Sequence, residues 1–76
     1  MKIRLNSVKN IRISGEYIKL DALLKYASIV STGGEAKILI TEGHVFVNGQ
    51  ICTQRGKKIR LNDIIRYKNR IIRIAE

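Results

Sequence analysis

The residues best suited to chemistry lie in the stretch 31–58, where a helix start is followed by a tight hairpin and a basic loop. Thr32 and Glu35 have the spacing of a capping box, in which the hydroxyl caps an early helical amide and the carboxylate reaches back. Gly33 and Gly34 leave the backbone bare at this point, where unpaired amides and the helix dipole favour an anionic group. The pattern therefore predicts that a phosphate binds at this helix start.

The second chemical feature is the basic loop, which we define as Gln54–Lys58. Its Gly56 lets the backbone turn closely past a ligand. The cations in and just after the loop are Arg55, Lys57, Lys58 and Arg60. Four cations within six residues repel one another, and residues 54–60 contain no acid to neutralise them. A solvated loop without a ligand is the weaker interpretation, so the loop predicts a polyanionic partner.

A short helix and a hairpin are expected to position these two features. The apolar face of the helix repeats at i, i+3 and i+4 and consists of Ala36, Leu39 and Ile40. Gly43 is expected to end the helix, because glycine accepts a positive φ. Val45 and Val47 alternate as in a strand, and Asn48–Gly49 is the strongest short hairpin signal. We expect the hairpin to bring the helix start and the basic loop onto one surface.

The remaining periodic segments predict one more helix and several strands. Leu20–Ala27 has helical spacing of its apolar residues, with Asp21 in the first turn where a carboxylate suits the dipole. Apolar and basic residues alternate from Ile65 to Lys68 and from Ile72 to Ile74, with a turn at Asn69–Arg70. These segments indicate half-buried antiparallel strands whose outward faces are basic.

Residues 2–13 also alternate as in strands, with a turn expected at Asn6–Ser7, and these strands are expected to pair with the C-terminal hairpin. Together the elements predict one α+β domain over residues 1–76. In it, two short helices pack on a small, mostly antiparallel sheet that carries an N-terminal strand extension. A domain of this size buries only about 60% of the surface of its unfolded chain.

Composition narrows the class of partner. Fifteen Lys and Arg against six Asp and Glu give a formal net charge of +9 over 76 residues. This balance predicts a polyanionic partner, and nucleic acid before a membrane surface. The single Cys52 rules out an internal disulfide and any multi-cysteine metal site. With neither a signal-peptide pattern nor an apolar run of about 20 residues, the chain is expected to be cytoplasmic and not membrane-bound.

The stretch from residue 16 to 76 resembles the S4-type RNA-binding domain, also called the αL motif. The resemblance rests on the segments Leu20–Lys25, Ala36–Ile40, Gly43, Val45–Gly49 and Asp63–Ile65. Within the family, the chain is similar to the small stand-alone YaaA-type proteins, through the segments Glu16–Leu20, Ser31–Lys37 and Cys52–Lys58. Residues 1–15 are then an extension to the family match. Asn62 stands where the family usually has Gly before Asp63, and Asn tolerates the positive φ of that turn.

The resemblance implies a non-catalytic protein that binds structured RNA, with ribosomal RNA or a ribosomal subunit as its partner in ribosome assembly or function. In the family, the face made by the second helix and the basic loop contacts RNA. Carried over by position, the RNA-binding residues are Thr32, Gly33, Lys37, Gln54, Arg55, Lys57 and Lys58, with Lys25 added to them.

Two residues depart from the family pattern. Thr32–Gly33 replaces a frequent Ser-Arg, so one cation at the helix start is missing. Phe46 stands where the middle of the hairpin strand is often Arg or Lys. An outward Phe46 could stack on an unpaired base or pack under the N-terminal extension, and the sequence leaves both interpretations open.

Catalysis is not predicted. The acids are scattered and have structural roles available to them, and the lone His44 cannot form a histidine cluster or relay. We therefore expect no catalytic residues, metal site, cofactor or small-molecule substrate. Three rival interpretations stay open: an adaptor whose basic face binds an acidic protein, a DNA-binding accessory protein, and a detached fragment of an RNA-modifying enzyme.

Overall fold

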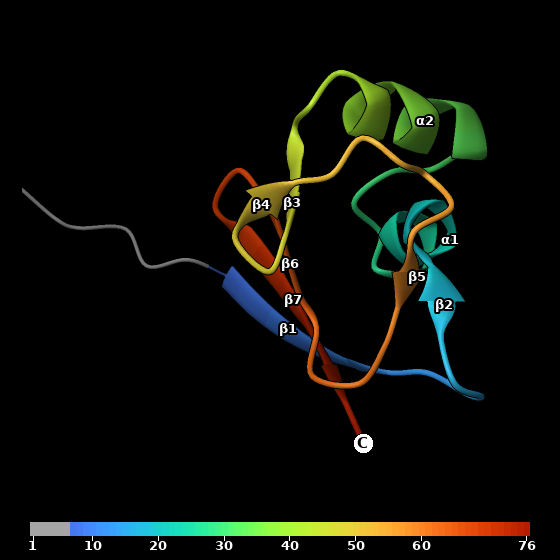
Figure 1. The fold of residues 1–76 in the computed structure, drawn as a ribbon, viewed down its shortest axis with the longest axis vertical. Helices are drawn as coiled ribbons and strands as arrows, with labels where there is room; N and C mark the ends of the chain where they lie inside the picture. The colour runs from blue at the N-terminus through green and yellow to red at the C-terminus, as the bar shows by residue number, and fades with distance from the viewer. Residues whose placement is uncertain (1–6) are drawn as a thin grey trace, which may run out of the picture.

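A computed structural model describes residues 7–76, in which two helices cover one face of a five-stranded sheet (Figure 1). The helices are α1 (Leu20–Tyr26) and α2 (Gly33–Thr41). The strands are β1 (Ser7–Arg12), β2 (Ile18–Lys19), β3 (Val45–Val47), β4 (Gln50–Ile51), β5 (Lys58–Ile59), β6 (Ile64–Tyr67) and β7 (Arg70–Ala75). This is the α+β class that the sequence predicted.

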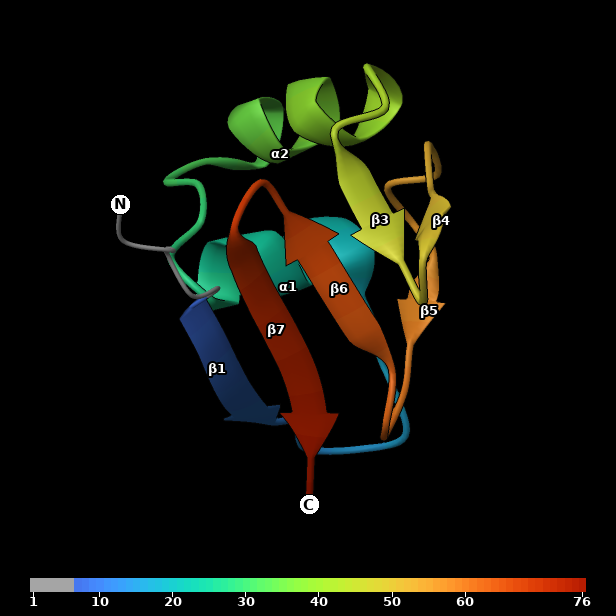
Figure 2. The ribbon, with the colours of Figure 1, turned by 90° about the vertical axis from the view of Figure 1, so that its left-hand side faces the viewer.

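The main sheet has the strand order β1-β7-β6-β3-β4, and Figure 2 shows it in front of α1. All its pairs are antiparallel except β1 with β7, which are parallel. The predicted pairing of the N-terminal segment with the C-terminal hairpin is therefore confirmed for β1. The expected turn at Asn6–Ser7 is wrong at Ser7, which begins β1. The strand expected around Ile3 and Leu5 lies outside the described residues.

The predicted hairpin turn is present at Asn48–Gly49. Both residues have positive φ, 52° and 87°, as a two-residue turn that matches the twist of its strands requires. The Asn48 side chain also ties this turn to the next one, because its Oδ1 accepts from the Ile64 amide at 2.9 Å and its Nδ2 donates to Asp63 Oδ1 at 3.0 Å. The hairpin is thereby held against β6 by side-chain as well as strand hydrogen bonds.

The turn before β6 depends on Asp63. Its Oδ2 accepts from the Arg60 amide at 2.8 Å, while its Oδ1 accepts from Asn48. Asn62 adopts a φ of 73°, so the left-handed conformation expected of this position is confirmed. The next turn begins one residue earlier than predicted, because Lys68 takes the positive φ of 55° and Arg70 already belongs to β7.

The core lies between the helices and the inner face of the sheet. Its fully or nearly buried residues are Ile11, Leu20, Leu23, Leu24, Ala27, Ala36, Ile40, Val45, Val47, Ile59, Ile65, Ile72 and Ile74. The apolar stripe predicted for α1 is entirely within this set, and so are two of the three residues predicted for α2. Leu39, the third, is partly buried against the core.

The pairing of β2 with β5 was not predicted. Ile18 pairs with Ile59 and Lys19 with Lys58, in a separate two-stranded antiparallel sheet. The same junction anchors the basic loop, because the first two amides of α1 donate to its carbonyls: Leu20 N to Lys57 O at 2.9 Å and Asp21 N to Arg55 O at 3.0 Å. The basic loop thus supplies the hydrogen-bond acceptors for the first amides of α1.

The strand register of β6 gives a first test. Ile65 is fully buried, whereas its neighbour Ile64 is 44% exposed. We expect Ile65→Ala to lower the free energy of unfolding by about 2–5 kcal/mol and Ile64→Ala to lower it by clearly less. Urea unfolding followed by circular dichroism measures both, and equal losses would contradict this register.

Candidate nucleic-acid interface

The start of α2 is closed by the predicted capping box. The Glu35 amide donates to Thr32 Oγ1 at 3.1 Å, and Glu35 Oε1 accepts from the amides of Thr32 at 3.2 Å and Ser31 at 2.8 Å. The carboxylate therefore satisfies amides that a phosphate would otherwise bind, and it places a negative charge at the helix start. Gly33 adds open space there, since a Cβ at this residue would meet no atom within 4 Å.

The helix start and the basic loop do not form the single surface that we expected. Figure 2 shows α1 and α2 running in opposite directions, with the first turn of α2 at the end of the helix away from the loop between β4 and β5. Because the loop is bonded to the first turn of α1, antiparallel packing sends the start of α2 to the other end of the helix pair. Thr32 and Gly33 are separated from the basic loop for this reason.

The predicted residues therefore fall into two groups. Lys25, in the last turn of α1, lies at the same end of the helix pair as the start of α2 (Figure 2). Lys37 is an exposed residue of α2. The second group is the basic loop itself, where Gln54, Arg55, Lys57 and Lys58 are all exposed. Of the two groups, the loop has the higher density of cations.

The surface that continues the loop was not predicted from the sequence. Lys58 Nζ lies 4.9 Å from the ring centroid of Tyr17, and Arg60 Cζ lies 5.6 Å from it. With Lys19, which pairs with Lys58, these residues form what we call the basic ribbon: Tyr17, Lys19, Lys58 and Arg60. The signal was present, because 17–19 and 58–60 both alternate polar, apolar and polar residues, but three residues are too few to identify a strand.

Within residues 7–76, no acidic residue forms a salt bridge with the cations of the basic ribbon. Lys19 and Lys58 stand directly opposite each other, and like charges at opposed positions of a strand pair are destabilising. Among residues 7–76, the one contact between a basic and an acidic side chain joins His44 Nε2 to Glu42 Oε1, at 3.5 Å, and involves none of the ribbon's residues. The ring of Tyr17 offsets part of the repulsion by cation–π contact. Cations held together in this way present a concentrated positive field to solvent.

Of the two interpretations of Phe46, the structure bears on packing under the N-terminal extension. The described part of the N-terminal extension, β1, is separated from β3 by β6 and β7, so it does not cover this ring. Instead, the Arg66 guanidinium lies over the half-buried ring of Phe46, 4.4 Å from its centroid. The interpretation that Phe46 packs under the extension is therefore wrong for the residues that the structure describes, and stacking on a base stays a prediction.

His44 and Cys52 each contact a residue that is two positions away in the chain. His44 is exposed beside Glu42, and Cys52 is half-buried, with its Sγ 3.7 Å from the carbonyl oxygen of Gln54. Within residues 7–76, no three His, Cys, Asp or Glu side chains are grouped so that they could hold a metal ion. Neither described helix is long and apolar enough to span a membrane.

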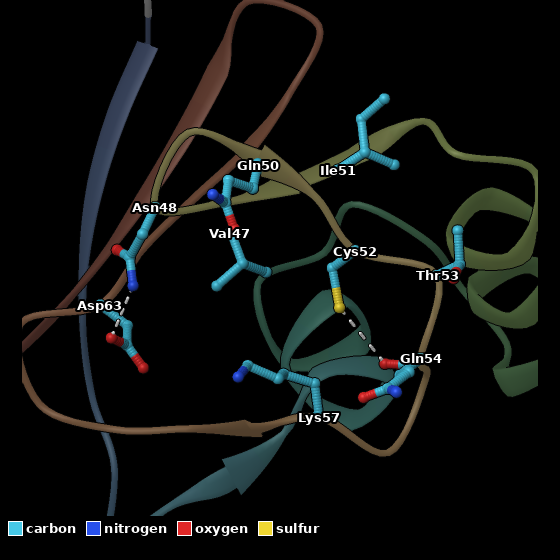
Figure 3. Close-up of a pocket in the computed structure, with 9 residues that line it drawn as sticks. All are labelled: Val47, Asn48, Gln50, Ile51, Cys52, Thr53, Gln54, Lys57 and Asp63. Atoms are coloured by element: carbon cyan, nitrogen blue, oxygen red, sulfur yellow. Dashed lines mark hydrogen bonds between the residues drawn. The ribbon is translucent and has the colours of Figure 1, made fainter.

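A pocket of about 360 Å³ lies between the β3–β4 hairpin and the basic loop (Figure 3). We call it the hairpin pocket. Its lining residues are Val47, Asn48, Gln50, Ile51, Cys52, Thr53, Gln54, Lys57 and Asp63. It thus joins two predicted binding residues, Gln54 and Lys57, to the two turns that Asn48 and Asp63 hold together.

Comparison with known proteins identifies the family. A model of the S4 domain matches residues 11–75, which is most of the chain. The chain belongs to the S4 domain family. The match begins at residue 11 and therefore includes the last two residues of β1.

Two individual proteins are similar to this S4 domain. The probable ribosome maturation protein RlbA of Bacillus subtilis (strain 168) is 36% identical over 55 residues, which cover 72% of this chain and 78% of that protein. The solution structure of YbcJ from E. coli, described as having an αL motif involved in RNA-binding, superimposes with a TM-score of 0.66 at 22% identity. That similarity covers 100% of this chain and 95% of YbcJ and shows a common fold.

The capping box allows the structural role of Thr32 to be measured. Thr32→Ala removes the acceptor of the Glu35 amide and is expected to lower the free energy of unfolding by about 0.5–2 kcal/mol. Thr32→Ser keeps a hydroxyl at this position and should keep most of that stability. Chemical denaturation of the two variants provides the comparison, and equal stability of both would show that the cap contributes nothing.

Proposed function

We propose that this S4 domain protein is a non-catalytic RNA-binding factor that recognises structured RNA, with ribosomal RNA in ribosome assembly or function as its target. The family and the name of the B. subtilis relative support a ribosome-related role. With this role we propose a cytoplasmic location. The basic loop and the basic ribbon together are the binding surface in this proposal.

The observation that carries the proposal is the cross-strand pair of Lys19 and Lys58, beside a loop whose cations form no salt bridge with any acid of residues 7–76. Folding gains nothing from opposed like charges, whereas a polyanion neutralises them. Arg55 and Lys57 extend the same positive region along the loop, over a backbone fixed by α1. A fixed backbone lowers the entropy lost when these side chains engage phosphates.

The basic loop and the basic ribbon form the type of surface that binds the phosphates of folded RNA. Phosphate contacts fix the orientation of a nucleic acid but carry no sequence information, and structured RNA is recognised largely by its shape. The basic loop and ribbon would bind one stretch of phosphates. Lys25, Thr32, Gly33 and Lys37 would contact a second stretch, nearer the opposite end of the helix pair, where Glu35 limits how closely an anion approaches.

The two loop cations should be needed for binding and dispensable for folding. We expect Arg55→Ala and Lys57→Ala each to weaken binding to purified ribosomal RNA while changing the free energy of unfolding by no more than about 0.5 kcal/mol. Their carbonyls, which accept the α1 amides, are unchanged by the substitution. Lys9→Ala is the matched control, because Lys9 is an exposed lysine of β1, at the far edge of the main sheet from β4.

Binding curves and urea denaturation of the same preparations separate the two effects. Unfolding of either loop variant would show that these side chains are structural. Loss of binding in the Lys9 control would show that binding depends on the total positive charge and not on its position.

The dependence of affinity on salt distinguishes phosphate binding from a protein interface. If Arg55, Lys57, Lys58 and Lys37 neutralise about four phosphates, log affinity should fall against log salt with a slope of about −3 to −4. Lys58→Ala should make that slope shallower by about 0.7–0.9. Phe46→Ala should leave it unchanged, because that ring lies under Arg66 and neutralises no phosphate.

Titrations of ribosomal RNA at several salt concentrations measure these slopes, with duplex DNA as the competitor. A slope near zero would overturn the electrostatic mechanism. Equal affinity for duplex DNA at matched salt would favour a DNA-binding protein over an RNA-binding one.

A further inference from the structure

The hairpin pocket has four walls of different chemistry, which Figure 3 shows around an open centre. Asn48 and Asp63 close one side, and the side chain of Lys57 runs along the β5 side with its Nζ toward the side of Asp63. Gln54 and the Sγ of Cys52 form the side next to the loop. Val47, which is 7% exposed, and Gln50 complete the wall toward the hairpin, whereas the side chain of Ile51 points away.

Two of the unused hydrogen-bonding groups of the pocket are the side-chain amides of Gln50 and Gln54. The side chains of Gln50 and Gln54 make no hydrogen bond to another residue within 7–76, and each carries two donors and an acceptor. Val47 and Cys52 provide an apolar surface between them. An apolar wall with free amides at its edge suits a flat heterocycle that has both donors and acceptors on its rim.

The walls are fixed before any ligand binds. The Asn48 side chain bonds to both Asp63 and Ile64, and the Cys52 amide donates to Val45 O at 2.9 Å. On the loop side, the Lys57 amide donates to Gln54 O at 3.1 Å. A pocket whose backbone is already tied on both sides loses little conformational entropy on binding.

The charges in the pocket distinguish a base from its phosphate. Both oxygens of Asp63 accept hydrogen bonds from the protein, so this carboxylate stays in place and opposes entry of an anion. The cations Arg55 and Lys58 lie outside the lining and flank Lys57 along the chain. Lys57, the cation among the lining residues, attracts an anion to the loop edge of the pocket, so a nucleotide would place its phosphate there and its neutral base inside, nearer Asp63.

We propose that the hairpin pocket binds a single unpaired base of the RNA whose phosphates lie on the basic loop. This proposal rests on the proposed function and adds a class of RNA to it. A base inside a duplex is stacked and paired and cannot enter, whereas a bulged or looped base can be turned out of its strand. The protein thus selects RNA stems that carry an unpaired nucleotide next to paired phosphates.

Cys52 makes the proposal measurable, because it is the only cysteine of the chain and its Sγ faces the pocket. Two RNA hairpins serve as probes: one carries a single bulged 2-aminopurine, and the other has the same stem fully paired. At saturating RNA, the bulged hairpin should slow alkylation of Cys52 by iodoacetamide severalfold, and the paired hairpin should leave the rate almost unchanged. Fluorescence of the 2-aminopurine should also change on binding of the bulged hairpin.

The side-chain amides provide the matched variants. Gln54→Ala and Gln50→Ala should each reduce the preference for the bulged over the paired hairpin by roughly two- to tenfold, as loss of one or two hydrogen bonds implies. Asn69→Ala removes an exposed amide from the turn between β6 and β7 and should change nothing. Circular dichroism of each variant checks that it is folded.

The outcomes separate this inference from the proposed function. Equal affinity for both hairpins, with equal alkylation rates of Cys52, would overturn the base pocket while leaving RNA binding in place. Failure to bind either hairpin or ribosomal RNA would overturn both. A bulge preference that survives in Gln54→Ala and Gln50→Ala, with Cys52 unprotected, would place the unpaired base elsewhere on the protein.

Discussion

The structure depends on two hydrogen bonds between backbones: those from the first amides of α1 to the carbonyls of Lys57 and Arg55. The first amides of a helix have no partner within it, so they need acceptors from elsewhere. Here α1 has no side-chain cap, and the basic loop supplies those acceptors. One contact therefore satisfies a helix end and gives the loop a defined course, and the cationic side chains leave that loop toward solvent.

This arrangement explains which parts of the fold the sequence predicted. The capping box of α2, the Asn48–Gly49 turn and the apolar stripes are local patterns, and each is present in the structure. The pairing of β2 with β5 joins residues about forty apart through two residues on each side, which is too short for periodicity to reveal. The acceptors for the first amides of α1 could not be predicted either. They are backbone carbonyls, which every residue type carries.

The sequence predicted the exposed cations of the basic loop but not the position of the loop relative to α2. The loop residues are exposed, and in the described part of the chain no salt bridge joins them to an acid, as their pattern indicated. The start of α2 was grouped with them only because a hairpin connects the two along the chain. The start of α2 is separated from the basic loop because α2 runs antiparallel to α1, and that direction is determined by helix packing. Lys19 and Tyr17 lie beside the basic loop because β2 pairs with β5, and in the sequence their segment indicated only the family resemblance.

The basic ribbon also links stability to binding. Ile18 and Ile59 pair on its inner side, with Ile59 fully buried, so apolar contact holds the strands together while Lys19 and Lys58 repel each other on the outside. A phosphate between the two lysines would replace that repulsion with attraction. A ligand that binds only the folded state stabilises it in proportion to the logarithm of its concentration above the dissociation constant. The same residues that weaken the free domain would therefore strengthen it most when a polyanion is bound.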